Sequence, residues 1–242
     1  MPALLMTASI GEAMSARVRI WLASVDSTAA SAIAAGTGWL GEDEAARLRL
    51  MTATSRQRSF LAGHWLARQV AADWLQAGTS RMALHRHGDG RPQLRVDGEP
   101  STLSLSLSHS GDWLAIALAT VPVGIDVELP RRSRDLRALA RFTFSREEVA
   151  RLDGLEEADY SAAFHRLWTL KEARGKRSGS GLLPGESRRV TSLPSDAGTA
   201  EATSWRLGDG ALSIAVDPGT QVEIVGGEGL RAPAYWRYRD DR

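Results

Sequence analysis

Three strand patterns follow one another closely in the middle of the chain, and they constrain the fold more than any other feature. Leucine and serine alternate strictly from Leu103 to Ser108, which predicts a half-buried strand. After a break at 110–112, the apolar stretches 113–119 and 123–128 predict two further strands. The centre of the chain must therefore form a sheet.

Helical patterns flank this centre on both sides, so the chain mixes helices with strands. The apolar spacing predicts helices over 29–35, 42–51, 59–75, 136–141, 146–152 and 158–176. Further strands are predicted over 17–23, 84–87, 93–96, 211–216 and 222–225. The pair 84–87 and 93–96 flanks a glycine-rich turn, which indicates a hairpin. These patterns favour the α+β class, with mixed α/β as the looser description.

The chain divides into halves of similar size at a boundary near Pro122. We expect three parts, which are a flexible extension over 1–15, an N-terminal half over 16–122 and a C-terminal half over 123–242. Each half combines helices with an antiparallel hairpin. The stretch 184–204 is rich in Ser, Gly, Pro and Thr and is predicted to be a loop, whereas 232–242 gives no clear pattern.

Charge and composition exclude several classes of protein. The 242 residues carry a formal net charge of only +1, whereas a general nucleic-acid binder needs a strong basic excess. The chain has no cysteine, which excludes disulfides, zinc-thiolate and iron–sulfur sites and a cysteine nucleophile. No apolar run approaches the ~20 residues of a membrane helix, and the first residues lack the basic start of a signal peptide. We therefore expect a cytoplasmic protein that binds neither nucleic acid nor a membrane.

Asp126 and Glu128 share one face of the predicted strand 123–128, because alternate residues of a strand point the same way. Two carboxylates so placed repel each other, which water tolerates and a protein core does not. A hard divalent cation would remove this repulsion and could also bind a phosphate. The alternative is a solvated strand face that holds no ligand.

The only two lysines, Lys171 and Lys176, fall within one short stretch, and every other basic residue is an arginine. In the predicted helix 158–176, Glu172 and Lys176 have the i,i+4 order that favours an ion pair. Lys171 falls within the apolar stripe of the same helix. It either runs along apolar surface to reach water or occupies a protected site that receives an anion.

Several other residues could contact an anion. Ser108 and His109 end the alternating strand at a tight turn, where an imidazole nitrogen can donate to a bound anion. Arg56 and Arg58 lie in the first turn of a predicted helix, where an anion would offset the positive end of the helix dipole. Arg91 is a cation in the turn of the predicted hairpin. For each of these residues the alternative is a structural or solvated role.

Four motifs, taken in order, resemble the 4′-phosphopantetheinyl transferases. They are Ser-His-Ser-Gly at 108–111, Gly-Ile-Asp-Val-Glu at 124–128, Trp-Thr-Leu-Lys-Glu-Ala-Arg-Gly-Lys at 168–176 and Gly-Ser-Gly-Leu at 179–182. The resemblance runs from about Arg47 to Leu182 and is strongest to the larger, surfactin-synthetase-activating type. It implies two similar halves related by pseudo-twofold symmetry, each a small antiparallel sheet packed with helices.

The resemblance implies a reaction in which phosphopantetheine moves from coenzyme A to a serine of an apo carrier protein, with release of adenosine 3′,5′-bisphosphate. Coenzyme A would bind between the two halves of a monomer. Mg²⁺, or alternatively Mn²⁺, would be held by Asp126, Glu128 and Glu172. Glu172 would take the serine proton, directly or through a bound water, and Lys176 and Asp126 would complete the catalytic set.

The resemblance also implies which side chains contact the coenzyme. They are Arg56, Arg58, Arg91, Ser108, His109, Lys171 and Lys176. The three arginines would hold its 3′-phosphate, because a guanidinium binds a phosphate with two parallel hydrogen bonds. The chain departs from the family at His64, where members often carry an arginine.

Two other functions remain open. The first is a non-catalytic module that binds coenzyme A or docks a carrier protein, although such a module has no need of Asp126, Glu128, Glu172 and Lys176 together. The second is an arginine-rich nucleic-acid binder, which would show a steep salt dependence. The net charge of +1 argues against this second function.

Overall fold

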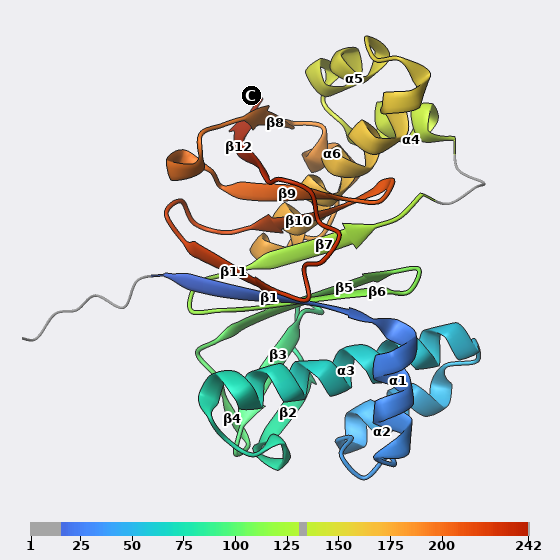
Figure 1. The fold of residues 1–242 in the computed structure, drawn as a ribbon, viewed down its shortest axis with the longest axis vertical. Coiled ribbons are helices and arrows are strands. Elements are labelled where there is room, and N and C mark those ends of the chain that lie inside the picture. Colours follow the sequence, from blue (N-terminus) through green and yellow to red (C-terminus); the bar gives the residue numbers. More distant parts are fainter. Residues whose placement is uncertain (1–15, 131–134, 242) are drawn as a thin grey trace, which may run out of the picture.

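The computed structural model describes residues 16–130 and 135–241, and its elements stack in four layers (Figure 1). Helices α1 to α3 form one outer layer, two sheets lie in the middle, and helices α4 to α6 form the other outer layer. This arrangement confirms the predicted α+β class with two halves, each a small sheet packed with helices.

The N-terminal half is built on a four-stranded sheet. In spatial order its strands are β11 (Gln221–Val225), β1 (Arg17–Ser24), β6 (Trp113–Ala119) and β5 (Ser104–Ser110). The helices of this half are α1 (Val25–Ala34), α2 (Glu42–Leu50) and α3 (Thr54–Leu75). A 3₁₀ turn over Thr79–Arg81 leads into a second, three-stranded sheet. Its strands are β2 (Met82–Arg86), β3 (Pro92–Val96) and β4 (Glu99–Pro100).

The C-terminal half is built on a five-stranded sheet. In spatial order its strands are β7 (Gly124–Glu128), β10 (Gly210–Ala215), β9 (Ala202–Leu207), β12 (Ala234–Asp240) and β8 (Val190–Pro194). Its helices are α4 (Leu136–Thr143), α5 (Arg146–Asp153), α6 (Glu157–Ser178) and the short α7 (Pro184–Ser187). A second 3₁₀ turn covers Ala197–Thr199.

Three apolar clusters hold the layers together. One lies between the two sheets and joins Ile20 of β1 to Ile125 of β7 and Leu212 of β10. The other two lie between each sheet and its own helices, around Leu114 in the N-terminal half and Phe164 in the C-terminal half. Each of these two sheets is therefore buried on both faces. This explains why β6 of one sheet and β10 of the other are nearly continuous apolar strands.

The chain crosses between the halves at β11, which lies between β10 and β12 of the C-terminal sheet in sequence but pairs with β1 of the N-terminal sheet. This pairing is parallel, with Val18 opposite Val222, whereas every other named strand pair is antiparallel in the part of the chain that the structure describes. The proposed division of the chain at residue 122 stays a prediction.

The polar face of the alternating strand β5 is buried against β7 rather than solvated. The hydroxyls of Ser104 and Ser106 accept hydrogen bonds from backbone amides of the β7 segment at 3.2 and 3.0 Å. Ser110 accepts a third such bond at 3.0 Å. Ser108 instead donates to a carboxylate of β7, that of Asp126, at 2.7 Å. These serine hydrogen bonds link the edge strand β5 of one sheet to the edge strand β7 of the other, in place of a backbone hydrogen-bond ladder.

Gly124 allows helix α6 to press against β7. A Cβ at this position would lie 2.0 Å from the carbonyl oxygen of Ala173, and no side chain tolerates such a contact. The close approach brings the C-terminal turns of α6 directly over the carboxylates of β7.

The remaining sequence predictions differ from the structure mainly at polar segments. The region 184–204, predicted to be a loop, contains α7 and β8 and leads into β9, and the unassigned tail contains β12. Helix α3 begins at Thr54 rather than at residue 59. The predicted extension over 1–15 lies outside the described residues.

Candidate active site

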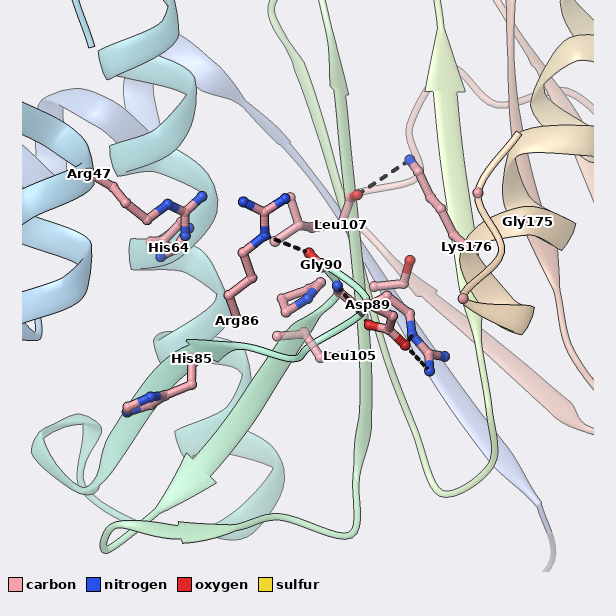
Figure 2. A pocket seen from close by; sticks show the side chains of 15 residues that line it. Arg47, His64, His85, Arg86, Asp89, Gly90, Leu105, Leu107, Gly175 and Lys176 are labelled. Carbon is pink, nitrogen blue, oxygen red and sulfur yellow. Dashed lines mark hydrogen bonds and ion pairs between the residues drawn. The ribbon is translucent and has the colours of Figure 1, made fainter. Parts of the chain in front are cut away.

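A cavity of about 370 Å³ opens between the two halves of the molecule (Figure 2). Arg47 and His64 lie on one side of it, and Gly175 and Lys176 lie on the other. Arg86 of β2 and the turn that follows it lie between these two sides. The full lining comprises Arg47, His64, His85, Arg86, Asp89, Gly90, Arg91, Pro92, Leu105, Ser106, Leu107, Gly175, Lys176, Gly179 and Gly181.

Lys176, Asp126 and Ser108 meet at one end of this cavity. The Nζ of Lys176 lies 2.8 Å from Oδ1 of Asp126, and the Ser108 hydroxyl donates to the same oxygen at 2.7 Å. Lys176 also donates to the carbonyl oxygens of Ile125 at 3.0 Å and Leu107 at 3.4 Å. An ammonium group so placed would meet the phosphates of a ligand that entered from the cavity.

Glu128 and Glu172 bring further negative charge to this end. Asp126 and Glu128 are both buried on β7, so the solvated strand face considered from the sequence does not exist. Burial raises the pKa of Glu172, and the charges of Asp126 and Glu128 raise it further against the opposing effect of Lys176. Both β7 carboxylates therefore lie close enough to Glu172 on α6 for their charges to raise its pKa.

These three carboxylates suit a hard divalent cation in their chemistry. Their oxygens are the ligands that Mg²⁺ takes, and the mutual repulsion that raises the pKa of Glu172 is what a cation would relieve. Within the described residues, no three acidic or histidine side chains are already gathered into a metal site. Mg²⁺ does not need such a cage, because it keeps several waters and combines one or two carboxylates with phosphate oxygens.

The turn between β2 and β3 reaches across the cavity to α6. Arg91 donates to the carboxylate of Asp89 at 2.9 Å and to the carbonyl oxygen of Arg177 at 3.1 Å. It lies against Gly179, where a Cβ would be 2.9 Å from the guanidinium carbon. Arg91 thus links the N-terminal half to the end of α6.

The opposite end of the cavity is formed by residues that the sequence interpretation did not assign to a site. The Glu44 carboxylate of α2 is buried and bonds to Nδ1 of His64 and to the guanidinium of Arg68. Burial alone would raise the pKa of Glu44, but these hydrogen bonds lower it to about 2. Arg47 stacks over the ring of Phe60, which also stacks on His64. No motif links these residues in sequence, because α2 and α3 meet only in the folded chain.

Two family models together match most of the chain. Residues 28–121 match the N-terminal part of 4′-phosphopantetheinyl transferases, and residues 122–217 match the 4′-phosphopantetheinyl transferase superfamily. The chain belongs to the 4′-phosphopantetheinyl transferase family. It is therefore a transferase enzyme, as the sequence motifs predicted.

Individual relatives agree with this assignment. The chain is 29% identical to the transferase HetI of Nostoc over 202 residues, which are 82% of this chain and 83% of HetI. It is 32% identical to the transferase psf-1 of Bacillus pumilus over 57% of this chain and 58% of psf-1. It is 34% identical to the transferase AcpT of Salmonella typhimurium over 63% of this chain and 74% of AcpT. HetI and psf-1 each match over nearly equal shares of both chains, so their lengths are close to that of this chain. This agrees with the larger type of transferase.

Lys171 lies away from the cavity, on the side of helix α6 that faces α5 and β8. Its ammonium is buried 2.8 Å from the Glu148 carboxylate and donates to the carbonyl oxygens of Ser187 and Val190. It does not line the cavity. Burial lowers the pKa of Lys171, and the charge of Glu148 opposes this effect. The anion beside Lys171 in this structure is therefore Glu148, and a contact of Lys171 with the coenzyme stays a prediction.

The structure also separates other predicted coenzyme contacts from the cavity. Arg58 pairs with Asp26 of α1 at 2.6 Å, and neither Arg58 nor Arg56 belongs to the lining. His109 is an exposed residue near the end of β5, where its side chain lies on the opposite side of the strand from Ser108. Three arginines were predicted to contact the coenzyme, and Arg91 is the one of them that lines the cavity.

The helices of the described residues offer no segment that is both long and apolar enough to pass through a lipid bilayer.

Proposed function

We propose that this transferase moves the 4′-phosphopantetheine group from coenzyme A to a serine of an apo carrier protein. The serine oxygen attacks the phosphorus next to the pantetheine, and the bond from that phosphorus to the bridging oxygen breaks. The bridging oxygen leaves with the adenosine part as adenosine 3′,5′-bisphosphate. The observation that carries the proposal is the surroundings of Lys176, which lines the cavity. Its ammonium bonds to Asp126 and lies near Glu128 and Glu172, whereas Arg47 and Arg86 line the other end of the cavity.

Glu172 is proposed to take the proton of the attacking serine. A general base works best when its pKa approaches the working pH, and burial and the β7 carboxylates raise the pKa of Glu172 from its ordinary value. The close packing of α6 on Gly124 holds this carboxylate over β7. The proton acceptor therefore has a fixed position relative to the bound diphosphate.

Lys176 is proposed to bind the diphosphate and to stabilise the charge that grows on it. Its ammonium already lies beside the cavity and is oriented by Asp126 and two backbone carbonyls. A donor that is fixed before the reaction stabilises the transition state without reorganisation. Ser108 holds the other partner of this pair, Asp126, in place.

The metal proposed for this site is Mg²⁺, with Mn²⁺ as the alternative. Asp126, Glu128 and Glu172 would hold it, and when bound it would neutralise negative charge on the diphosphate. We further propose that the enzyme acts as a monomer in the cytoplasm, on the resemblance to the larger transferases and the absence of cysteine from the chain.

Intact-mass spectrometry of an apo carrier protein tests this proposal. Incubation with the enzyme, coenzyme A and Mg²⁺ should add about 340 Da, the mass of the phosphopantetheine group. The gain should be lost with EDTA and with Glu172→Gln, and retained with Glu99→Gln, which changes an exposed carboxylate on β4. Coenzyme A binding without any gain, on several carrier classes, would instead indicate the non-catalytic module.

A further inference from the structure

Among the described residues, one carboxylate lines the cavity, and it belongs to Asp89. The other charged side chains of the lining are the cations of Arg47, Arg86, Arg91 and Lys176. Asp89 lies in the turn between β2 and β3, which faces the cavity between its two sides (Figure 2). A carboxylate in this place repels the phosphates of a ligand unless a cation already balances its charge.

Arg91 supplies this cation, two residues further along the chain. Oδ2 of Asp89 accepts from Nε of Arg91 at 2.9 Å and lies 2.7 Å from Nη2. Oδ1 accepts from the backbone amide of Arg91 at 3.1 Å and lies 2.9 Å from Nδ1 of His87. The hydrogen bonds from Arg91 hold the pKa of Asp89 well below its usual range, so the carboxylate is ionised at neutral pH. The two side chains therefore form a charge-assisted pair.

Every side-chain nitrogen of Arg91 has a partner within the protein. Its third nitrogen, Nη1, donates to the carbonyl oxygen of Arg177 at 3.1 Å. Arg86 differs, because it donates to the carbonyl oxygen of Gly90 at 3.3 Å and has no carboxylate partner in the part of the chain that the structure describes. A ligand phosphate can therefore bind Arg86 without a rival anion, whereas at Arg91 it competes with the Asp89 carboxylate.

The pair of Asp89 and Arg91 packs on the segment that follows helix α6. A Cβ at Gly179 would lie 2.9 Å from Oδ2 of Asp89 and 2.9 Å from the guanidinium carbon of Arg91. Glycine thus leaves room for both side chains at this point of the cavity wall. The carboxylate and the guanidinium are held together there by the packing as well as by their charges.

We propose that Asp89 is a positioning residue that competes with the ligand for Arg91 and so limits the affinity of the enzyme for coenzyme A. The inference rests on the proposed function, which brings the phosphates of coenzyme A into this cavity. A phosphate that binds Arg91 displaces the Asp89 carboxylate, and the lost contact offsets part of the binding free energy. Binding that is equally strong for substrate and transition state does not raise kcat, so this competition weakens binding without slowing the chemical step.

Isothermal titration calorimetry of the full chain with coenzyme A tests the inference on Asp89→Asn. The asparagine oxygen can still accept from the backbone amide of Arg91, so the variant keeps the turn and removes the charge. We expect Kd for coenzyme A to fall about tenfold, because Arg91 is then available to a phosphate. KM for coenzyme A should fall as well, and kcat should not rise. A purely structural role of Asp89 would instead raise Kd.

Matched variants show whether the gain in affinity depends on Arg91. Asp97→Asn removes an exposed carboxylate that accepts from Nε of Arg81 at 2.9 Å and does not line the cavity, so Kd should stay unchanged. Addition of Arg91→Gln to Asp89→Asn should abolish the gain. Addition of Arg237→Gln, which changes an exposed arginine of β12 away from the cavity, should preserve it.

A second variant, Asp89→Ser, covers the case in which Asp89→Asn does not fold. Its hydroxyl also offers an acceptor to the turn and carries no charge, so we expect a similar gain in affinity. Thermal unfolding of each variant verifies that the fold is intact.

The outcomes separate this inference from the proposed function. If coenzyme A binds neither the unaltered protein nor the variants, the proposed function is wrong and this inference falls with it. If coenzyme A binds and is used, an unchanged or larger Kd in the folded Asp89 variants overturns the inference alone. A gain that persists after Arg91→Gln would overturn the claim that Asp89 acts through Arg91.

Discussion

Lys176 and Asp126 form an ion pair of 2.8 Å that joins the end of helix α6 to strand β7 beside the cavity. Asp126 is buried, whereas Lys176 keeps part of its side chain exposed toward the cavity. The pair thus has one fixed member and one that can reach a ligand. The Ser108 hydroxyl completes the support of Asp126 from the other sheet.

Removal of the Lys176 charge should reduce catalysis. In Lys176→Met the diphosphate loses its fixed cation and Asp126 keeps only Ser108, so we expect kcat for carrier modification to fall about 100-fold. A steady-state assay of carrier modification measures this, with Arg237→Gln as the matched surface control. Activity within twofold of the unaltered enzyme would contradict the role given to Lys176.

Metal removal should abolish the reaction while the fold persists. We expect EDTA to stop carrier modification, and Mg²⁺ to restore it, because burial and the charges of Asp126 and Glu128 raise the pKa of Glu172, and a cation would offset this repulsion beside a diphosphate. Asp126→Asn and Glu128→Gln should each require at least tenfold more Mg²⁺ for half-maximal activity. Full activity in EDTA would show that these carboxylates do not serve a metal.

Lys171 should matter for stability and not for coenzyme binding. Lys171→Met leaves the Glu148 carboxylate buried without its cation, which costs about 3–5 kcal/mol of unfolding free energy. The double variant Lys171→Met with Glu148→Gln should recover part of that loss. Urea unfolding measures both. A coenzyme A affinity that falls more than tenfold in a folded Lys171→Met protein would restore the phosphate contact predicted from the sequence.

Glu44 should make stability depend on pH in the acid range. Its pKa in the folded protein is about 2, below its ordinary value of 4.5. Because the folded pKa is depressed, the stabilisation is present above about pH 4.5 and is lost as the pH falls toward 2. It amounts to about 3 kcal/mol.

Unfolding of Glu44→Gln tests this linkage across the same pH range. The variant should be less stable at neutral pH and should lose less stability between about pH 4.5 and 2 than the unaltered protein. Glu42→Gln, an exposed change on the same helix, should behave like the unaltered protein. Parallel stability curves for Glu44→Gln and the unaltered protein would exclude the linkage.

The sequence predicted most elements because their apolar periodicity is local. It failed at 184–204, where buried hydroxyls such as Thr191 and Ser204 give strands β8 and β9 a polar composition. It also could not show that the serine face of β5 is buried. The serines of that strand satisfy their hydroxyls on β7, and a hydropathy pattern does not distinguish a second sheet edge from water.

The same limit applies to the site. Asp126 and Lys176 belong to compact motifs, so their place in one site was predicted, although the contact between them was not. Arg47, His64 and Arg86 come from three elements that only tertiary packing brings together. The pairing of Lys171 with Glu148 could not be predicted either, because Glu148 lies on another helix.

The most direct test of the proposed transfer measures both products of the reaction. A carrier protein, coenzyme A, Mg²⁺ and the enzyme are mixed, and the modified carrier and free adenosine 3′,5′-bisphosphate are counted from the same sample. We expect equal amounts of the two, and neither with Glu172→Gln or with a carrier whose target serine is alanine. Bisphosphate release without carrier modification, or binding of coenzyme A with neither product, would contradict it.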